Sequence, residues 1–139
     1  MPLDIDFVTV DSDDPEKLAR FWMQLLDFEL KYDSATDPSV SDTIDGEREV
    51  LIQAPTGRRP QARILFIEVH DEKQMKNRLH FDLRSEQDQD GYVAKAESLG
   101  ATRVDIGQGD DKPWVVMADP EGNEFCILRD RAAREANTT

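Results

Sequence analysis

Cysteine, long apolar runs and basic residues are all scarce in this sequence. Cys126 is the single cysteine among 139 residues, so the chain cannot form an internal disulfide. The opening residues, Met1 to Asp6, are acidic and lack the apolar segment of a secretory signal peptide. Disulfides and signal peptides both accompany export, so their absence predicts a cytoplasmic protein. No apolar run approaches the roughly 20 residues that a membrane-spanning helix needs.

Basic side chains are outnumbered by acidic ones, 17 to 30, and the formal net charge is −13. Nucleic acids and anionic membranes are bound through basic surfaces, so neither is expected as a partner. Apolar residues make up 38% of the chain, which is enough for a globular core rather than a disordered segment. The length suits a single domain, residues 1–139.

The first half of the chain opens with a predicted strand at residues 3–10 and then a helix. Asp14 suits the N-cap position, and Pro15 suits the first helical position, where a backbone N–H is not needed. Apolar side chains then recur at helical spacing and form one stripe. The stripe consists of Leu18, Phe21, Trp22 and Leu25.

Three more strands are predicted before the middle of the chain, at 28–32, 50–54 and 63–69. The segments between them are rich in Asp, Ser, Pro and Gly, which is typical of loops. The first of these loops has room for a short strand at 40–44.

The second half opens with the strand RLHFDL at 78–83. Apolar and polar residues alternate there, which places Arg78, His80 and Asp82 together on one face. A helix is predicted next, from about 87 to 99. Gly100 follows it, at the position where a positive φ closes many helices.

The remaining extended segments are predicted at 101–106, 114–118 and 124–129. The last two are joined by DPEGN at 119–123, and an early proline with a late glycine is typical of a tight turn. Each half therefore contains a strand, a helix and three extended segments. A shift of 73 positions superposes Phe7 on His80 and also brings the two helix ends together. This weak internal repeat indicates a βαβββ unit that occurs twice.

The predicted fold class is therefore α+β, with paired βαβββ modules that form a curved mixed sheet around a cleft. Module one covers about 1–70 and module two about 77–129. The tail at 130–139 lacks apolar periodicity and is predicted to be frayed or a short exposed helix.

Three stretches resemble the glyoxalase/bleomycin resistance/dioxygenase (vicinal oxygen chelate) superfamily: DPEKLARFWMQLL at 14–26, KNRLHFDL at 76–83 and DPEGNEFCIL at 119–128. They are most similar to its glyoxalase-like branch. The resemblance implies the paired-module fold, a small-molecule ligand and a homodimer, with lyase or dioxygenase chemistry if the protein is an enzyme. Asp27 departs from the glycine that commonly follows the first helix of the family.

The resemblance also implies four metal-ligand positions, in the first and last strand of each module. They fall on Phe7, on His80, on Cys126 and on either Ile67 or Glu68. Phe7 cannot bind a metal, and a gap-free alignment favours Ile67 on the inner face, although the sequence leaves this choice open. No metal cofactor is therefore predicted. The alternative is a divalent metal held by His80, Glu68 and Cys126.

Several of these residues also have other possible roles. His80 with Asp82 suits a general base oriented by a carboxylate, and Cys126 suits a nucleophile if its thiol is activated. Trp114 could stack on a flat ligand, and Arg78 could hold an anionic group. Each residue is also compatible with an ordinary structural role.

We expect a metal-independent, mostly apolar cup that binds or transforms a small organic molecule, with His80 as the catalytic residue of any reaction. The expected lining consists of Phe7, Arg78, Asp82, Trp114 and Cys126. Two alternatives remain open: a metal-dependent lyase or dioxygenase that uses His80, and a non-catalytic sensing or association module.

Overall fold

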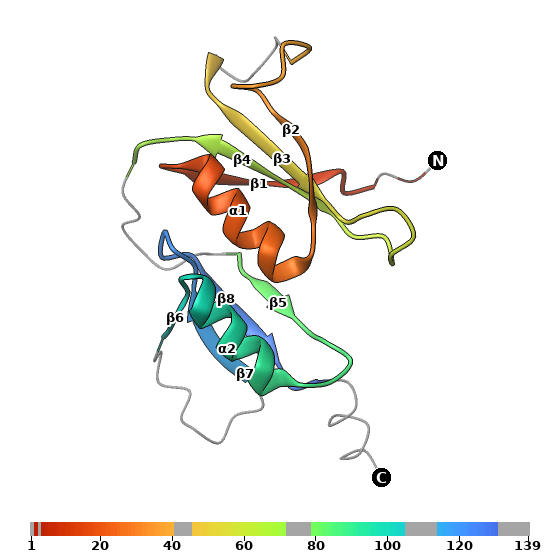
Figure 1. The fold of residues 1–139 in the computed structure, drawn as a ribbon, viewed down its shortest axis with the longest axis vertical. Coiled ribbons are helices and arrows are strands. Elements are labelled where there is room, and N and C mark those ends of the chain that lie inside the picture. Colours follow the sequence, from red (N-terminus) through yellow and green to blue (C-terminus); the bar gives the residue numbers. More distant parts are fainter. Residues whose placement is uncertain (1, 3, 41–45, 72–78, 105–113, 131–139) are drawn as a thin grey trace. The chain divides into compact units, whose positions relative to one another are not determined.

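The computed structural model describes residues 2, 4–40, 46–71, 79–104 and 114–130. It divides into two compact units, Met1–Glu72 and Lys73–Thr139. Each unit contains one helix and one four-stranded sheet (Figure 1). The expected short strand at 40–44 and the tail beyond residue 130 lie largely outside the described residues.

Unit 1 contains strand β1, helix α1 and then three strands. Their bounds are β1 Phe7–Ser12, α1 Pro15–Leu26, β2 Glu29–Asp33, β3 Glu49–Gln53 and β4 Arg63–Glu68. The sheet order is β1-β4-β3-β2. Strand β1 runs parallel to β4, and the other two pairs are antiparallel. The first and last strands of the unit therefore lie side by side.

Helix α1 begins where the sequence predicts. The Asp14 side chain accepts a hydrogen bond from the backbone N–H of Lys17, and Pro15 is the first helical residue. The predicted stripe is buried, with Leu18 0% and Trp22 2% exposed. Burying each such side chain contributes roughly 1.5–3 kcal/mol. The helix ends at Asp27, which adopts the left-handed conformation with φ 53°.

The strand register of unit 1 separates two faces of the sheet. Val10, Phe66 and Val50 pair across β1, β4 and β3 on the face that α1 covers. Alternate residues, such as Leu51 and Leu65, lie on the opposite face, which we call the helix-free face of unit 1.

A charge network fastens α1 to the sheet of unit 1. Arg48 donates to both carboxylate oxygens of Asp33, at 3.1 and 2.7 Å, and to Glu16 of α1 at 3.3 Å. The Arg48 guanidinium lowers the pKa of Asp33 through this hydrogen bonding. The Asp33 side chain is only 10% exposed, so the pair is a structural ion pair rather than a surface contact.

Unit 2 repeats the same topology. Its elements are β5 Phe81–Leu83, α2 Gln89–Leu99, β6 Thr102–Arg103, β7 Trp114–Ala118 and β8 Glu124–Leu128. The sheet order is β5-β8-β7-β6, and β5 runs parallel to β8. The predicted internal repeat and the α+β fold class are therefore confirmed.

Two local features that the sequence predicts in unit 2, the end of α2 and the turn at 119–123, have the expected geometry. Gly100 closes α2 with φ 117°, a conformation that residues with a Cβ rarely adopt. In the 119–123 turn, the buried Asp119 carboxylate accepts the backbone N–H groups of Glu121 and Asn123, both at 2.9 Å. The turn is thus held by its own first side chain.

Some predicted strand bounds were wrong. Strand β1 covers Phe7–Ser12 rather than 3–10, because it pairs with β4 only over that range. Strand β5 covers Phe81–Leu83, because it is an edge strand with three residues paired to β8. Strand β6 is limited to Thr102–Arg103, and residues 105–106 of its predicted range lie outside the described part. Helix α2 begins at Gln89, with Asp88 as its N-cap.

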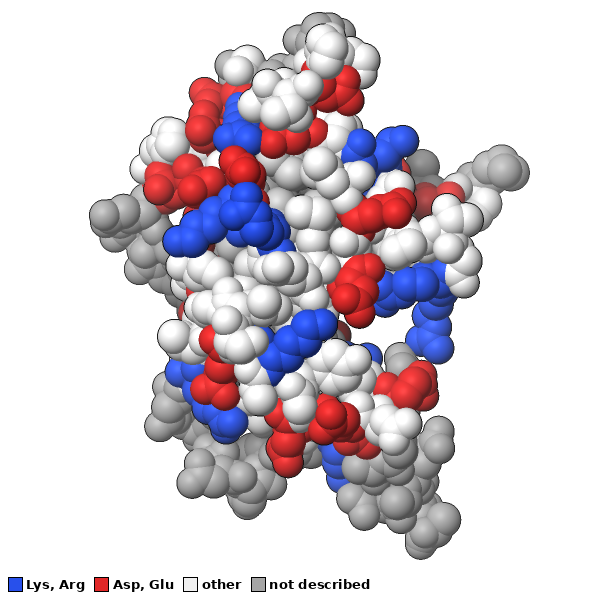
Figure 2. All heavy atoms as spheres, viewed as in Figure 1, with Lys and Arg blue, Asp and Glu red and all other residues white. Residues whose placement is uncertain are grey.

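Charged side chains of both signs are interspersed on the viewed face of the molecule, and the basic ones form separate small groups (Figure 2). Among the described residues, neither helix has the length and apolar composition needed to cross a membrane.

Candidate functional site

The candidate site lies on the sheet of unit 2. Asp82 of β5, Cys126 of β8 and Val116 of β7 pair across the sheet and therefore share one face. Phe125 and Met117 alternate with them and are buried in the core beside α2. We call the face that bears Asp82 and Cys126 the helix-free face of unit 2.

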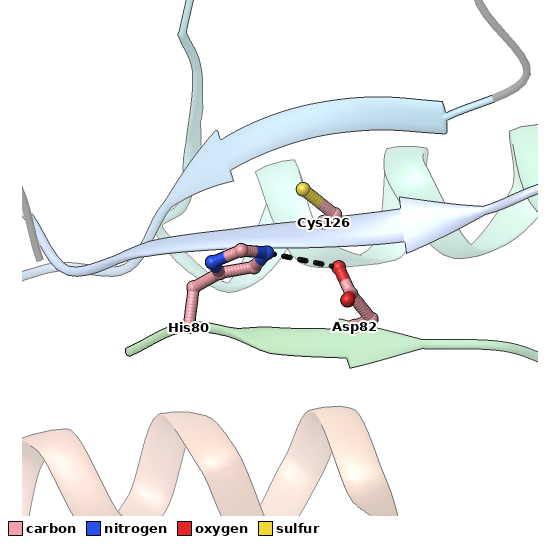
Figure 3. Close-up of side chains that lie close together, drawn as sticks. All are labelled: His80, Asp82 and Cys126. Atoms are coloured by element: carbon pink, nitrogen blue, oxygen red, sulfur yellow. Dashed lines mark ion pairs between the residues drawn. The ribbon is translucent and has the colours of Figure 1, made fainter. Parts of the chain in front are cut away.

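Three polar side chains meet on this face. His80 Nε2 lies 3.2 Å from Asp82 Oδ1, and each of these side chains is about half exposed. The sulfur of Cys126 lies beside them: one ligand atom from each of the three residues falls within 4.8 Å of the others. Figure 3 shows His80, directly before β5, and Asp82 of β5 extending toward β8, which carries Cys126. The sequence predicted each of these residues as part of the site, and the structure brings them together.

The geometry of this trio suits proton transfer. A carboxylate beside Nε2 favours a proton on that nitrogen, which leaves Nδ1 of His80 as the proton acceptor. Half exposure of both side chains leaves them accessible to a ligand. Cys126, 9% exposed, contributes a largely buried thiol beside the pair.

The same trio has a donor set that a divalent metal could use. Imidazole nitrogen, thiolate sulfur and carboxylate oxygen are all ligands of zinc, and catalytic zinc sites commonly have three protein ligands. All three donors come from unit 2. The two positions of unit 1 that the family resemblance assigns to ligands, Phe7 and Ile67, carry apolar side chains. A metal here would therefore depend on Asp82, which the sequence did not assign as a ligand.

Of the remaining expected site residues, Trp114 and Phe7 belong to the described part of the chain. Trp114 opens β7, opposite Leu128 and on the same face as Cys126. Phe7 belongs to unit 1, where it is 40% exposed, and the Arg63 guanidinium lies 5.8 Å from its ring centroid. Arg78 lies outside the described residues.

The register of β4 answers the question that the sequence left open between Ile67 and Glu68. Ile67 pairs with Asp11 and so shares a face with Phe7, whereas Glu68 pairs with Ser12 on the side of α1. Glu68 Oε2 lies 3.8 Å from His70 Nε2.

Two polar features were not found by sequence reasoning. His70 contacts Asp13 at 2.6 Å, and this hydrogen bond raises the His70 pKa. Glu49 is 5% exposed at the start of β3. For Glu49 the sequence shows only that a charged residue precedes the apolar run VLI. Such a residue ordinarily lies in solvent, so its burial was not predicted.

Two βαβββ modules in one chain define the architecture of the glyoxalase/bleomycin resistance/dioxygenase proteins, the vicinal oxygen chelate superfamily. The family model described as the glyoxalase-like domain matches residues 7–128. The chain therefore belongs to the glyoxalase-like domain family. No curated protein matches the sequence significantly.

Solved structures agree on the fold. The fosfomycin resistance protein FosX from Mesorhizobium loti has a TM-score of 0.68 at 14% identity, with 99% of each chain covered. A FosX mutant from Listeria monocytogenes, in complex with Mn(II) and 1S,2S-dihydroxypropylphosphonic acid, has a TM-score of 0.67 at 17% identity, covering 98% of this chain and 99% of that one. A glyoxalase/bleomycin resistance protein/dioxygenase family enzyme from Burkholderia phytofirmans has a TM-score of 0.58 at 22% identity, covering 90% and 97%. At these identities the likeness extends to the fold alone.

Proposed function

We propose that the protein binds a small organic molecule on the helix-free face of unit 2 and exchanges a proton with it through His80, without a metal. The observation that supports this most directly is the His80–Asp82 pair at 3.2 Å, beside Cys126. Family membership supports a small-molecule ligand.

In this proposal each residue has a defined role. Nδ1 of His80 accepts an acidic proton from the ligand, and Asp82, 3.2 Å from Nε2, orients the imidazole. Trp114, half-buried on the same face, provides apolar surface for the body of the ligand. General acid–base catalysis of this kind contributes about 10²–10⁴-fold to a rate.

Proton exchange with solvent tests this role before the physiological substrate is known. Small carbonyl and hydroxy acids are screened for those that raise the melting temperature of the protein, since a ligand of the folded state stabilises it by mass action. Each hit is then incubated in D₂O, and deuterium incorporation is followed by NMR. We expect exchange with the wild type and a loss of about 100-fold or more in His80→Gln.

Asp82→Asn serves as the positioning variant, and Glu124→Gln, on the same strand as Cys126, serves as a matched control. If Asp82 orients His80, the Asn variant should slow exchange and shift its pH profile, while the control should leave both unchanged. Equal exchange in wild type and His80→Gln would rule out the proposed role.

A metal-dependent reaction is the second candidate, and the donor cluster of His80, Asp82 and Cys126 within 4.8 Å favours it. A bound divalent metal would supply Lewis-acid activation of a ligand oxygen. This candidate predicts stoichiometric zinc, manganese, iron or nickel in protein purified without chelators. It also predicts loss of that metal in Cys126→Ser. Protein that contains less than a tenth of an equivalent after incubation with each ion would exclude it.

The proposal extends to assembly and location. A homodimer is expected from the family resemblance, and a cytoplasmic location from the single cysteine. Sedimentation velocity on the purified chain tests the first, because the dimer has twice the 15.9 kDa mass of the chain.

A further inference from the structure

An arginine extends the helix-free face of unit 2 just beyond the candidate site. Arg84 directly follows β5, and no turn or bend interrupts the backbone at residues 84 and 85. Side chains alternate along an extended segment, so Arg84 shares the face of Asp82, two residues earlier. Continuing the register of β5 and β8 by one residue sets Arg84 beside Leu128, whose partner on β7 is Trp114.

The guanidinium of Arg84 has donors that no described residue uses. Its Nε atom is buried and lacks a hydrogen-bond partner, and no ion pair engages Arg84 within the described part of the chain. The chain has 30 acidic residues, so a shortage of acids does not explain an unpaired arginine. Burial of Nε also shows that the side chain is packed, which leaves the terminal nitrogens Nη1 and Nη2 as donors for a ligand. A guanidinium held in this way loses little freedom when it binds.

The charges on this face favour an anion at Arg84 only. Asp82 and Glu124 are the acids that β5 and β8 place there. The other described arginines of unit 2, Arg103 and Arg129, alternate with residues of this face and lie on the side of α2. A chain with a net charge of −13 repels an anionic ligand except where a cation is close. Arg84 therefore marks the place where an anionic group can bind.

We propose that Arg84 binds the carboxylate of a small hydroxy or oxo acid through Nη1 and Nη2, with the body of the acid against Trp114. Guanidinium and carboxylate form two parallel charge-assisted hydrogen bonds, a geometry that a neutral ligand does not match. Four residues of extended chain, from His80 to Arg84, span about 13 Å, and the long arginine side chain can close part of that distance. One small acid can therefore reach both residues. Arg84 thereby selects the ligand class, and this assignment rests on the proposed function only for the role of His80.

Mandelate and its neutral amide, mandelamide, test the charge requirement. Burial slows exchange of the Arg84 Nε–H with solvent, so its proton–nitrogen NMR signal can be followed in the full chain and is assigned by its absence in Arg84→Gln. We expect mandelate to shift this signal in a concentration-dependent way, and mandelamide at equal concentration to leave it in place. A signal that neither compound shifts, or that both shift equally, overturns the proposal.

Three variants separate a specific contact from a general effect of charge. Arg84→Gln should lower the affinity for mandelate at least about 10-fold, and Arg84→Lys, which keeps the charge without the planar fork, should fall between it and the wild type. Arg129→Gln also removes an arginine with a buried, unpartnered Nε, so it is the matched control and should bind as the wild type does. Undiminished binding in Arg84→Gln, a Lys variant no better than Gln, or an equal loss in Arg129→Gln contradicts the proposal.

Deuterium incorporation into mandelate from D₂O separates this proposal from the one for His80. His80→Gln should lose the exchange and keep the mandelate-induced shift of the Arg84 signal. Mandelate that binds through Arg84 but takes up no deuterium with the wild type would refute the proton transfer and leave the Arg84 site standing.

Discussion

Replacement of Asp33 by Asn should destabilise unit 1 measurably. The Asp33 side chain is 10% exposed. Its carboxylate accepts two hydrogen bonds from Arg48 and one from the backbone N–H of Ala35 at 3.0 Å. Removal of one partner of a fully buried pair costs about 3–5 kcal/mol. Arg48 is 27% exposed and forms an ion pair with Glu16 at 3.3 Å, which the variant keeps. The loss of unfolding free energy should therefore be smaller than for a fully buried pair. We expect a loss of roughly 2–3 kcal/mol, or a fall of about 6–12 °C in melting temperature.

Urea unfolding measures this loss in a Trp114→Phe background, where Trp22 of α1 is the remaining tryptophan and reports on unit 1. Glu29→Gln, at an exposed position of β2, is the control and should stay within about 0.5 kcal/mol of the parent. An Asn variant as stable as this control would refute the assigned role of the Asp33–Arg48 pair.

The pH dependence of the same variant gives an independent check. Hydrogen bonding from Arg48 lowers the pKa of Asp33 in the folded state, so its contribution is present above the unfolded pKa, about 3.9, and is lost as the pH falls through the folded value. The difference in unfolding free energy between parent and variant should therefore be constant near neutral pH and shrink below about pH 4. A difference that stays the same on acidification contradicts this sign.

Two further predictions concern the turn in unit 2 and the histidine of unit 1. Asp119→Ala should lower the unfolding free energy by about 2 kcal/mol, because two backbone N–H groups lose a buried acceptor; a change under about 0.5 kcal/mol in urea unfolding would contradict this. His70 should titrate above its ordinary pKa of 6.5 by NMR, because Asp13 accepts its proton, and Asp13→Asn should return the midpoint toward 6.5. The stability from this pair is present below the unfolded pKa and is lost as pH rises through the folded one. An unchanged midpoint in Asp13→Asn would show that the contact is not formed in solution.

The parts of the fold that sequence could predict are those determined by neighbouring residues. Asp14 and Pro15 fix the start of α1, and the stripe through Trp22 fixes its buried face. Gly100 marks the end of α2 in the same local way. Alternation along one strand was also enough to place His80 and Asp82 on one face.

The parts that could not be predicted depend on pairing between distant segments. The place of Glu49 in the sheet depends on the pairing of β3 with β4, which sets it opposite Ile67. His70 meets Asp13, 57 residues away, because β1 and β4 are parallel neighbours. Strands β5 and β6 are short because only a few of their residues pair with β8 and β7. The local sequence pattern does not predict how many residues pair.

The most direct test of the central claim is deuterium incorporation from D₂O into a bound carbonyl or hydroxy acid, measured by NMR with chelator-treated protein. The account predicts that exchange persists after chelation and falls about 100-fold or more in His80→Gln. Exchange that disappears with the chelator and returns with added zinc, or that continues undiminished without His80, would contradict it.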